Sequence, residues 1–311
     1  MAEETPLFAR VALIGMGLIG SSMALAMRRA GLAGEIVGAA RSAATRDTAL
    51  RLRLADAMFA EAAEAARGAD LVVLATPIGA FGAIAAEIGE VLEAGAIVTD
   101  VGSVKGMVLR DVAPHLPLNV HLVPGHPVAG TEHSGPEAGF AELFENRWCI
   151  LTPPDDAEAA AVDKVAELWR RMGAKVEIMP AQHHDLVLAI TSHVPHLIAY
   201  NIVGTASDLE TVTQSEVIKF SAGGFRDFTR IAASDPTMWR DVFLNNKEAV
   251  LEMLGRFVED LTALQRAIRW GEGETLFDLF THTRAIRRSI VEAGQETAVA
   301  DFGRRQPAQG E

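Results

Sequence analysis

Several residue types are scarce in this chain of 311 residues, and each scarcity narrows the possible functions. A single cysteine, Cys149, rules out an internal disulfide and fits a reducing compartment. Basic residues number 28 against 41 acidic ones, and the net charge of -13 argues against a nucleic-acid-binding surface. The start, Met1-Ala2-Glu3-Glu4, resembles neither a signal peptide nor a membrane span. We therefore expect a soluble, cytoplasmic protein that does not act on membranes.

Apolar residues are abundant, at 49%, which is enough for a large core and suggests two domains. An apolar run at 11–14 is followed by Gly15-Met16-Gly17-Leu18-Ile19-Gly20 and then by a helical pattern that ends at Gly31. In this strand–turn–helix context the three glycines predict a dinucleotide site. Gly15 permits the turn, Gly17 lets the backbone approach a pyrophosphate, and Gly20 allows close packing of helix on strand. The helix N-terminus then faces the phosphates.

The end of the next predicted strand, residues 35–40, bears on the choice of cofactor. An NAD-binding fold usually places an acidic residue there for the ribose 2′-hydroxyl. This chain instead has Ala40, followed by Arg41 and Ser42, which suit a 2′-phosphate. The pattern favours NADP over NAD, although Arg41 could also stack on the adenine or face solvent. We expect the cofactor to contact Gly15, Gly17, Leu18, Ile19, Gly20, Arg41, Ser42, Thr76 and Pro77.

Strand and helix patterns continue to alternate, with strands at 70–75, 96–100, 120–123 and 175–178 and helices at 60–67, 78–92 and 156–172. This alternation predicts an α/β domain with a mostly parallel, doubly wound sheet. Ligands gather at the carboxyl ends of such strands. Chemically useful side chains follow the strand ends: Thr76, Asp100, Ser103, Lys105 and His126. The Gly- and Pro-rich stretch from Gly125 to Gly135 is expected to be irregular, and it would present His126 for chemistry. Cys149 lies in a strand-like run and is expected to be a buried structural thiol.

From His183 onward the pattern is helical. A long apolar helix over 183–207 should kink at Pro195 or end its first part there. His193 and His196 share one face, and because no third ligand is evident, a pocket wall is favoured over a metal site. Asp227 and Arg230 fall on one turn, either as a surface pair or as a carboxylate clamp in which Asp227 holds Arg230.

A single helix is expected from Asp235 to about Trp270, and its apolar stripe suggests a dimer interface. A last helix covers 274–293, and the tail from Asp301 is expected to be disordered.

With these segments laid out, the chain resembles the prephenate/arogenate dehydrogenase family of tyrosine biosynthesis. The resemblance covers nearly the whole chain. It is carried by the segments at 15–20, 100–106, 125–135, 192–196, 223–230 and 234–241. It implies a Rossmann domain followed by an all-α dimerisation domain, which we place at 1–181 and 182–300 with a tail at 301–311. It also implies a homodimer that carries out NAD(P)-dependent oxidative decarboxylation of prephenate or L-arogenate, with tyrosine as an inhibitor.

The resemblance also implies roles for individual residues. His126 hydrogen-bonds the ring hydroxyl of the substrate, Ser103 supports that interaction, and Arg230 holds a substrate carboxylate. The remaining substrate-pocket positions are Thr131, His196, Asp227 and Trp239. No metal is implied. The Ala40-Arg41 pair departs from the NAD-binding members of the family, so the cofactor choice stays open between NADP and NAD.

Two other functions remain as alternatives. A β-hydroxyacid dehydrogenase would also join a Rossmann domain to helices, but it would need a catalytic lysine, and Lys219 and Lys247 lie in no convincing motif. A non-catalytic NADP sensor would bind the cofactor without turnover. The sequence does not distinguish prephenate from arogenate, which differ only in a keto or an amino group on the side chain.

Overall fold

The computed structural model describes residues 5–131, 133–213 and 222–292. Its contacts divide the chain into two compact units, Met1–Val250 and Leu251–Glu311. The expected tail from Asp301 and the candidate Lys219 lie outside the described residues. The first unit contains every residue of the predicted site that the structure describes, so it is taken first.

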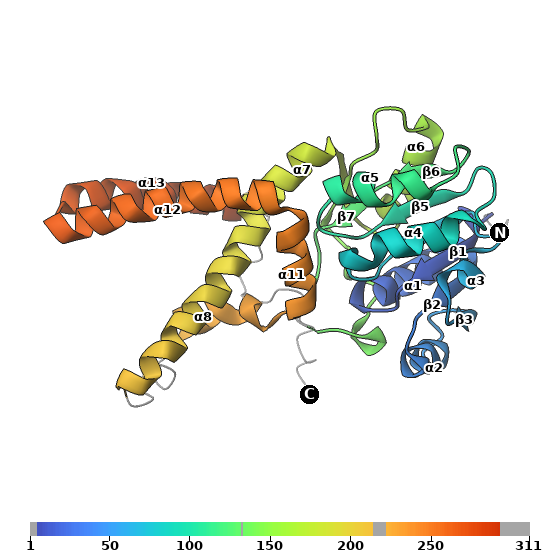
Figure 1. Ribbon diagram of the computed structural model, residues 1–311, viewed down its shortest axis with the longest axis horizontal. Coiled ribbons are helices and arrows are strands. Elements are labelled where there is room, and N and C mark those ends of the chain that lie inside the picture. The colour runs from blue at the N-terminus through green and yellow to red at the C-terminus, as the bar shows by residue number, and fades with distance from the viewer. Residues whose placement is uncertain (1–4, 132, 214–221, 293–311) are drawn as a thin grey trace. The chain divides into compact units, whose positions relative to one another are not determined.

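A parallel sheet of six strands forms the centre of the first unit, and it confirms the predicted fold class (Figure 1). Its order is β3-β2-β1-β4-β5-β6. The bounds are β1 Phe8–Ile14, β2 Ala33–Ala39, β3 Ala57–Phe59, β4 Leu71–Leu74, β5 Ile97–Asp100 and β6 His121–Val123. The order reverses beside β1, where β1 pairs with both β2 and β4. Such a reversal opens a crevice at the carboxyl ends of the strands.

Both faces of this sheet are covered, because side chains alternate along each strand. On β1, Val11 and Leu13 pack into one core with helices α1 (Leu18–Ala30) and α6 (Ala159–Arg171). Ala12 and Ile14 pack into a second core on the opposite face. Helices α3 (Ala62–Ala66), α4 (Phe81–Gly89) and α5 (Gly106–Asp111) contribute to that second core. The sheet is therefore doubly wound, as expected.

Some elements differ from their predicted form. Helix α2, Ala43–Arg51, was not expected, and Ser42 is its N-cap, with the hydroxyl accepting a hydrogen bond from the Thr45 N–H at 3.4 Å. The expected helix at 60–67 shortens to α3 and is preceded by β3. Short edge elements carry little periodicity, so neighbouring contacts decide their form.

The glycine-rich turn after β1 has the geometry that its sequence predicts. Gly15 has a φ of 108°, in the region that favours glycine. A Cβ on Gly20 would lie 2.1 Å from the Gly15 carbonyl oxygen, so only glycine allows α1 to approach the turn. A Cβ on Gly17 would meet nothing within 4 Å, so this position faces open space.

The prediction of an irregular loop after β6 is wrong for the first three residues of that segment. Gly125–Pro127 is a strand, β7, which pairs antiparallel with β8 (Trp148–Leu151), and β8 pairs parallel with β9 (Lys175–Ile178). Backbone pairing with β8 overrides the turn-forming composition of this segment, so His126 lies on a strand opposite Ile150. Cys149 on β8 is fully buried and burial raises its pKa well above the ordinary value, as expected for a structural thiol.

A buried ion pair joins the two sheets. Asp100 at the end of β5 and Lys105 in the following loop are both fully buried and contact each other directly. The Lys105 ammonium also donates to the Gly125 carbonyl oxygen at 2.6 Å. The Asp100 carboxylate accepts from the N–H groups of Gly102 at 2.8 Å and Gly125 at 3.2 Å. Burial raises the pKa of Asp100 and lowers that of Lys105, while each partner's charge opposes those shifts.

The helical half of the first unit begins with α7, Ala181–Leu188. A π-helical segment, Ala189–His193, joins it to α8, Val194–Thr213. The π segment ends two residues before Pro195, which cannot donate a backbone hydrogen bond, so the regular α-helical pattern is interrupted just before this proline while the helix continues through it. After residue 221 come α10 (Gly223–Thr229), a 3₁₀ turn (Arg230–Ala233) and α11 (Pro236–Asn245).

The prediction of a single helix from Asp235 to Trp270 is wrong, because the helix is interrupted at Asn246. Helix α11 ends there, and α12 runs from Lys247 to Trp270. Asn246 has a non-helical conformation, with φ −108° and ψ 32°. Its side-chain amide donates to the Asp185 carbonyl oxygen at 2.8 Å and lies 3.1 Å from His193 Nδ1. Contacts with α7 therefore fix a break that the apolar periodicity of the sequence does not reveal.

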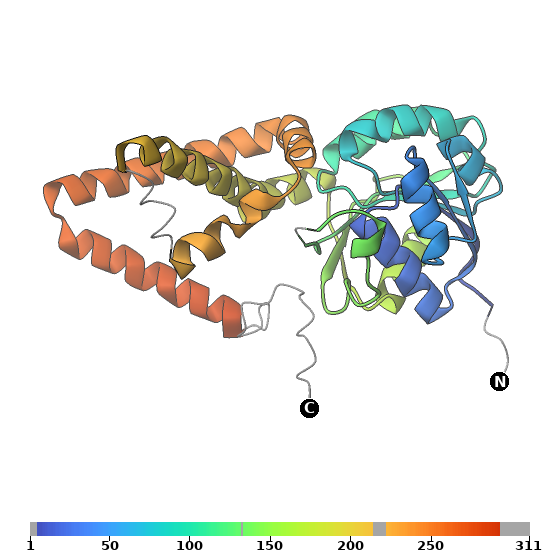
Figure 2. The same cartoon turned by 90° about the horizontal axis from the view of Figure 1, so that it is seen from below.

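The second unit contains most of α12 and all of α13, Gly273–Glu292, which confirms the predicted last helix. Figure 2 shows the two helices diverging from the turn that connects them. Many of their apolar side chains are exposed within the single chain: Leu251, Val258, Leu261, Ile268, Phe277, Phe280, Ile286 and Ile290.

In the first unit, the helical stretch Ala181–Leu209 is long and apolar enough to cross a membrane by length and composition alone. Its buried hydrogen bonds through His184 and Asp185 are instead those of a folded protein core.

The glycine geometry predicts different effects for two alanine substitutions. Gly20→Ala should lower the unfolding free energy by about 1–3 kcal/mol, because its Cβ would overlap the Gly15 carbonyl oxygen. Gly17→Ala should change it by no more than about 0.5 kcal/mol, because the added methyl faces open space. Urea unfolding of the cofactor-free protein measures both changes. Equal unfolding free energies of the two variants would contradict these different steric roles of Gly20 and Gly17.

The buried pair predicts a large effect of removing only one charge. Lys105→Met should destabilise the protein by about 3–5 kcal/mol, because it leaves the Asp100 carboxylate buried without its cation. The double variant Lys105→Met/Asp100→Asn should recover much of that loss, because it removes the uncompensated charge. Urea unfolding followed by circular dichroism measures this. A single variant as stable as the unmodified protein would refute the role of the pair.

Candidate active site

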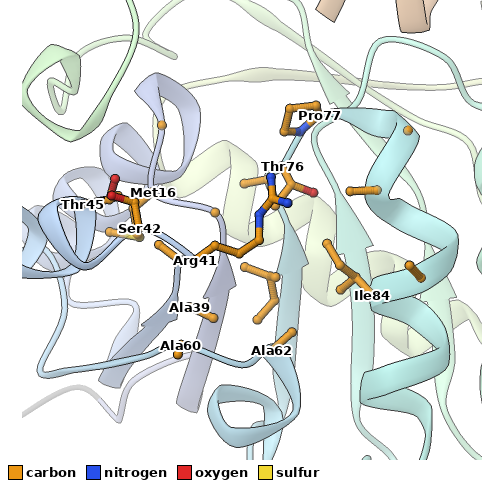
Figure 3. Close-up of a pocket in the computed structure, with 18 of the residues that line it drawn as sticks. Met16, Ala39, Arg41, Ser42, Thr45, Ala60, Ala62, Thr76, Pro77 and Ile84 are labelled. Carbon is orange, nitrogen blue, oxygen red and sulfur yellow. Dashed lines mark hydrogen bonds between the residues drawn. The ribbon is translucent and has the colours of Figure 1, made fainter. Parts of the chain in front are cut away.

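A cleft of about 1160 Å³ lies at the carboxyl ends of the parallel strands (Figure 3). Its walls come from the glycine turn, the end of β2, the segment after β4, and α11. The α11 contribution, Thr237, Arg240 and Asp241, was not expected from the sequence. Asp241 approaches the segment after β4 closely, since a Cβ on Gly79 would lie 2.7 Å from a carboxylate oxygen of Asp241. The cleft is where the reversed strand order predicts a nucleotide.

The floor of this cleft fits the pyrophosphate of a dinucleotide. Helix α1 begins after Gly17 with no side-chain cap and no acidic residue in its first turn, so its N-terminal N–H groups are available to an anion. The open space beside Gly17 allows that anion to approach the backbone. Thr76, which also lines the cleft, has a buried hydroxyl with no hydrogen-bond partner among the described residues. A bound ligand would satisfy both sets of groups.

The residues predicted to select the cofactor lie at the end of the cleft beside β2. Arg41, Ser42 and Thr45 all line it. Figure 3 shows the Arg41 side chain extending across the cleft toward Thr76. Arg46 is engaged elsewhere, since its guanidinium donates to the carbonyl oxygens of Ala40 at 2.7 Å and Arg41 at 2.8 Å. Arg46 therefore fixes the turn that carries Arg41, and the Arg41 side chain lines the cleft together with Arg240 of α11.

His126 is held on β7 next to the buried ion pair. Its neighbour Gly125 contacts both Asp100 and Lys105, as described above, so the backbone at His126 is tied to the end of β5. The imidazole of His126 is almost fully buried. Burial lowers the pKa of His126 well below 6.5, and the nearby His184, Lys105 and His193 lower it further. His126 is therefore neutral near pH 7 and able to accept a proton.

His126 Nδ1 lies 2.8 Å from His184 Nε2, and His184 Nδ1 lies 2.8 Å from a carboxylate oxygen of Asp185. Neither His184 nor Asp185 was predicted from the sequence to belong to the site. The run His183-His184-Asp185 contains suitable residue types, but nothing in the sequence shows that it meets a strand 58 positions earlier. The fold therefore supplies the contact that the sequence does not.

The other two loop residues of the predicted site, Ser103 and Thr131, have less defined roles. Ser103 lies between Asp100 and Lys105 and is half-buried. The structure records no hydrogen bond from its side chain to any described residue, and Nδ1 of His126 is already occupied by His184. Thr131 lies beyond β7, where its hydroxyl accepts from the His133 N–H at 3.2 Å.

The predicted pocket residues of the helical half form a compact group. His196 stacks on Trp239 with ring centroids 3.7 Å apart and an interplanar angle of 23°. The Nδ1 of His196 donates to the Ser192 carbonyl oxygen at 2.8 Å, which leaves Nε2 as an acceptor. His193 is fully buried, and burial lowers its pKa to about 4. The indole N–H of Trp239 and His193 Nε2 are buried without a partner among the described residues.

Asp227 lies on α10 and Arg230 begins the turn that follows this helix. Asp227 Oδ1 lies 3.5 Å from Arg226 Nε, and both side chains are exposed. Arg230 begins the 3₁₀ turn after α10 and is half-buried. It is close enough to His196 to lower the pKa of that imidazole, although burial of His196 is the larger cause. A cation thus stands beside the His196–Trp239 stack.

Comparisons with known proteins agree with this arrangement. A family model described as the prephenate dehydrogenase nucleotide-binding domain matches residues 23–178, and one described as the prephenate dehydrogenase dimerization domain matches residues 180–282. A cyclohexadienyl dehydrogenase of Zymomonas mobilis is 41% identical over 283 residues, covering 91% of this chain and 96% of that protein.

Two solved structures are similar over most of their length. The prephenate dehydrogenase of Aquifex aeolicus, crystallised with hydroxyphenyl propionate and NAD+, has a TM-score of 0.86 at 34% identity, covering 93% of this chain and 100% of that one. The Synechocystis arogenate dehydrogenase has a TM-score of 0.75 at 25% identity, covering 90% and 99%. The two family models together span both halves of the chain. The chain therefore belongs to the prephenate dehydrogenase family of nicotinamide-dependent oxidoreductases.

Proposed function

We propose that this protein oxidatively decarboxylates prephenate, L-arogenate or both, giving 4-hydroxyphenylpyruvate or L-tyrosine. The observation that carries the proposal is the neutral, buried His126 held at the carboxyl edge of the sheet, on the same side as a dinucleotide cleft. The hydroxyphenyl propionate and NAD+ bound to the Aquifex aeolicus relative support this chemistry. The Zymomonas and Synechocystis relatives, a cyclohexadienyl and an arogenate dehydrogenase, support the inclusion of both substrates.

In this proposal His126 is the general base. Its Nε2 accepts the proton of the ring hydroxyl while the carbon that bears this hydroxyl loses hydride. The bound nicotinamide supplies the hydride acceptor. The carbonyl that forms on the ring draws electrons from the breaking C–C bond, so carbon dioxide leaves, the ring becomes aromatic, and the ring oxygen takes back the proton from His126 to give the phenol. Ser103, in the loop beside the Asp100–Lys105 pair, contacts the hydroxyl or the Nε2 side of His126.

The substrate is anionic, and the helical half provides the groups to bind it. We assign Arg230 to a substrate carboxylate, since a guanidinium binds a carboxylate through two hydrogen bonds. His196 and Trp239, stacked on each other, form the adjoining wall, and Thr131 and Asp227 complete the substrate pocket. The indole N–H of Trp239 has no partner among the described residues, and we assign it as a further hydrogen-bond donor for the substrate.

The cofactor preference that we propose is NADP over NAD. Support comes from Arg41 at the rim of the cleft and from Ser42 at the N-terminus of α2, where an anion is favoured. No acidic residue stands at the end of β2 to repel a 2′-phosphate. Gly15, Gly17, Leu18, Ile19 and Gly20 would bind the pyrophosphate, and Thr76 and Pro77 would line the path toward the nicotinamide.

The domain organisation belongs to the same proposal. We place the cofactor-binding domain at 1–181 and a substrate-binding and dimerisation domain at 182–300. The exposed apolar side chains of α12 and α13 support a homodimer, because a second copy would cover them. Inhibition by tyrosine and a cytoplasmic location are also proposed, from the family of biosynthetic enzymes to which the chain belongs.

The base assignment predicts both a rate and a pH effect. His126→Asn should lower kcat by about 10²–10⁴-fold while the protein stays folded, because asparagine cannot accept the proton. In the unmodified enzyme kcat/KM should fall only as pH drops through the lowered pKa of His126, below 6.5, because the protonated imidazole is inactive. Steady-state kinetics across pH measure both. An unchanged kcat in the variant would remove His126 from the mechanism.

The cofactor assignment predicts a change of preference in one variant. Arg41→Asp should weaken NADP binding by about 10–100-fold, because a charged hydrogen bond to the 2′-phosphate is replaced by repulsion. NAD binding should be little affected. Arg67→Asp makes the same charge change at an exposed position outside the cleft and is the control. Fluorescence titrations of the unmodified protein and the two variants give the six Kd values for NADP and NAD, and an unaltered NADP preference in Arg41→Asp would refute the assignment.

A further inference from the structure

The hydrogen bonds behind His126 form a directed chain that the proposed function does not require. His126 Nδ1 meets His184 Nε2 at 2.8 Å, with the two rings edge to face at a centroid distance of 5.0 Å. His184 Nδ1 in turn meets Asp185 Oδ1 at 2.8 Å. His184 is fully buried and Asp185 nearly so. Solvent therefore does not compete for these bonds, and each proton position is set by the partner atoms.

Asp185 sets the direction of these hydrogen bonds. Its Oδ1 accepts the Lys105 backbone N–H and its Oδ2 accepts the Gly106 N–H, each at 2.8 Å. Both oxygens are thus acceptors, as in an ionised carboxylate, so the His184 nitrogen that faces Asp185 must carry a proton. Asp185 itself is held by the N-terminal end of α5 rather than by a flexible surface contact.

The remaining protons follow from neutrality. Burial lowers the pKa of both His184 and His126, so each ring carries one proton near pH 7. Since the His184 proton is on Nδ1, its Nε2 is a lone-pair acceptor. His126 must then donate from Nδ1, and its own lone pair is left on Nε2. This is the tautomer that a base acting through Nε2 needs.

We propose that His184 and Asp185 are positioning residues that hold His126 in its Nδ1–H tautomer and share the positive charge that His126 gains when Nε2 accepts a proton. This inference rests on the proposed role of His126 as the base. Neither residue is assigned a contact with substrate or cofactor. A Ser–His–Asp triad uses a carboxylate to orient a histidine in a comparable way, and there the wrong tautomer greatly slows catalysis. Here a second histidine stands between the carboxylate and the base.

The other ionisable groups close to His126 do not orient its imidazole in place of His184 and Asp185. Lys105 and Asp100 are committed to each other and to Gly125. His193 bonds through Nδ1 to the side chain of Asn246, which also donates to the Asp185 backbone carbonyl. Cys149 is a buried thiol opposite Pro127 on β8. Among the described residues, the ionisable groups that act on the His126 imidazole are therefore His184, Lys105 and His193, with Asp185 behind His184, Asp100 behind Lys105 and Cys149 on the paired strand β8.

Three substitutions separate positioning from simple packing. His184→Leu removes both hydrogen bonds, whereas His184→Gln keeps an amide oxygen to accept from His126 and an amide N–H to donate to Asp185. His183→Leu makes the same change at the exposed neighbouring position and is the control. We expect His184→Leu to lower kcat by about 10²–10³-fold with KM and cofactor Kd little changed. His184→Gln should recover much of kcat, and His183→Leu should match the unmodified enzyme.

The tautomer is measured directly by long-range ¹H–¹⁵N correlation spectra of the cofactor-free protein labelled in histidine, with His126→Asn used to assign the signals. We expect a protonated Nδ1 and an unprotonated Nε2 for His126, and loss of that pattern in His184→Leu. A protonated Nε2 in the unmodified protein would overturn the inference. So would normal kcat and an unchanged spectrum in a folded His184→Leu. If His184→Leu does not fold, the spectrum of the unmodified protein and kcat of His184→Gln still decide.

These outcomes are distinct from failure of the proposed function. The spectra need no turnover, so they test the tautomer even if neither substrate reacts. If His126→Asn abolishes turnover while His184→Leu does not, the base stands and its positioning by His184 falls. If His126→Asn keeps full activity, the base assignment falls and the positioning role of His184 falls with it, whereas the proposed function itself fails only if the unmodified protein oxidises neither substrate.

Discussion

The arrangement of this site depends on one buried ion pair. Asp100 at the end of β5 and Lys105 in the loop that follows are fully buried, and together they bind both backbone groups of Gly125. The same loop presents the Lys105 and Gly106 N–H groups to Asp185. A single loop of the parallel sheet therefore fixes β7, which carries His126, and α7, which carries His184. Burying two charges is unfavourable unless both are fully hydrogen-bonded, and here the carboxylate and the ammonium each have additional partners.

Because this loop holds β7 and α7 in place, the cofactor cleft, the proposed base and the proposed substrate pocket can come from different elements. The parallel sheet supplies the cofactor cleft at the reversal of its strand order, and the small three-stranded sheet supplies the base. The helical segment supplies the residues behind the base and the wall formed by His196 and Trp239. Such an arrangement suits a reaction without covalent intermediates, in which the protein positions the hydroxyl, the base and the cofactor and excludes water.

The sequence was informative where a local pattern has one physical solution. Gly15, Gly17 and Gly20 predicted the turn because each has a steric role that no other residue fills, and the alternating apolar runs predicted the parallel sheet. Pro195 lacks an N–H, and a π-helical irregularity does lie just before it, although the helix continues through the proline. The resemblance to a known family added the candidate site residues, and the comparisons confirm that family.

The sequence was uninformative where long-range contacts decide. Composition predicted irregular structure at Gly125–Pro127, yet pairing with β8 makes it a strand. The apolar stripe predicted one helix across Asn246, yet its bonds to Asp185 and contact with His193 end α11 there. His184 and Asp185 carry no motif of their own, and their relation to His126 exists only in the folded chain. Residues that position other residues are for this reason the hardest to find from sequence.

The most direct test of the account is the reaction itself. Purified protein is mixed with prephenate or L-arogenate and with NADP or NAD, and the reduced cofactor and the released carbon dioxide are measured together. The account predicts equal amounts of the two products with at least one substrate, with faster turnover at low cofactor concentration for NADP. Cofactor binding without reduction by either substrate, or reduction without carbon dioxide, would contradict it.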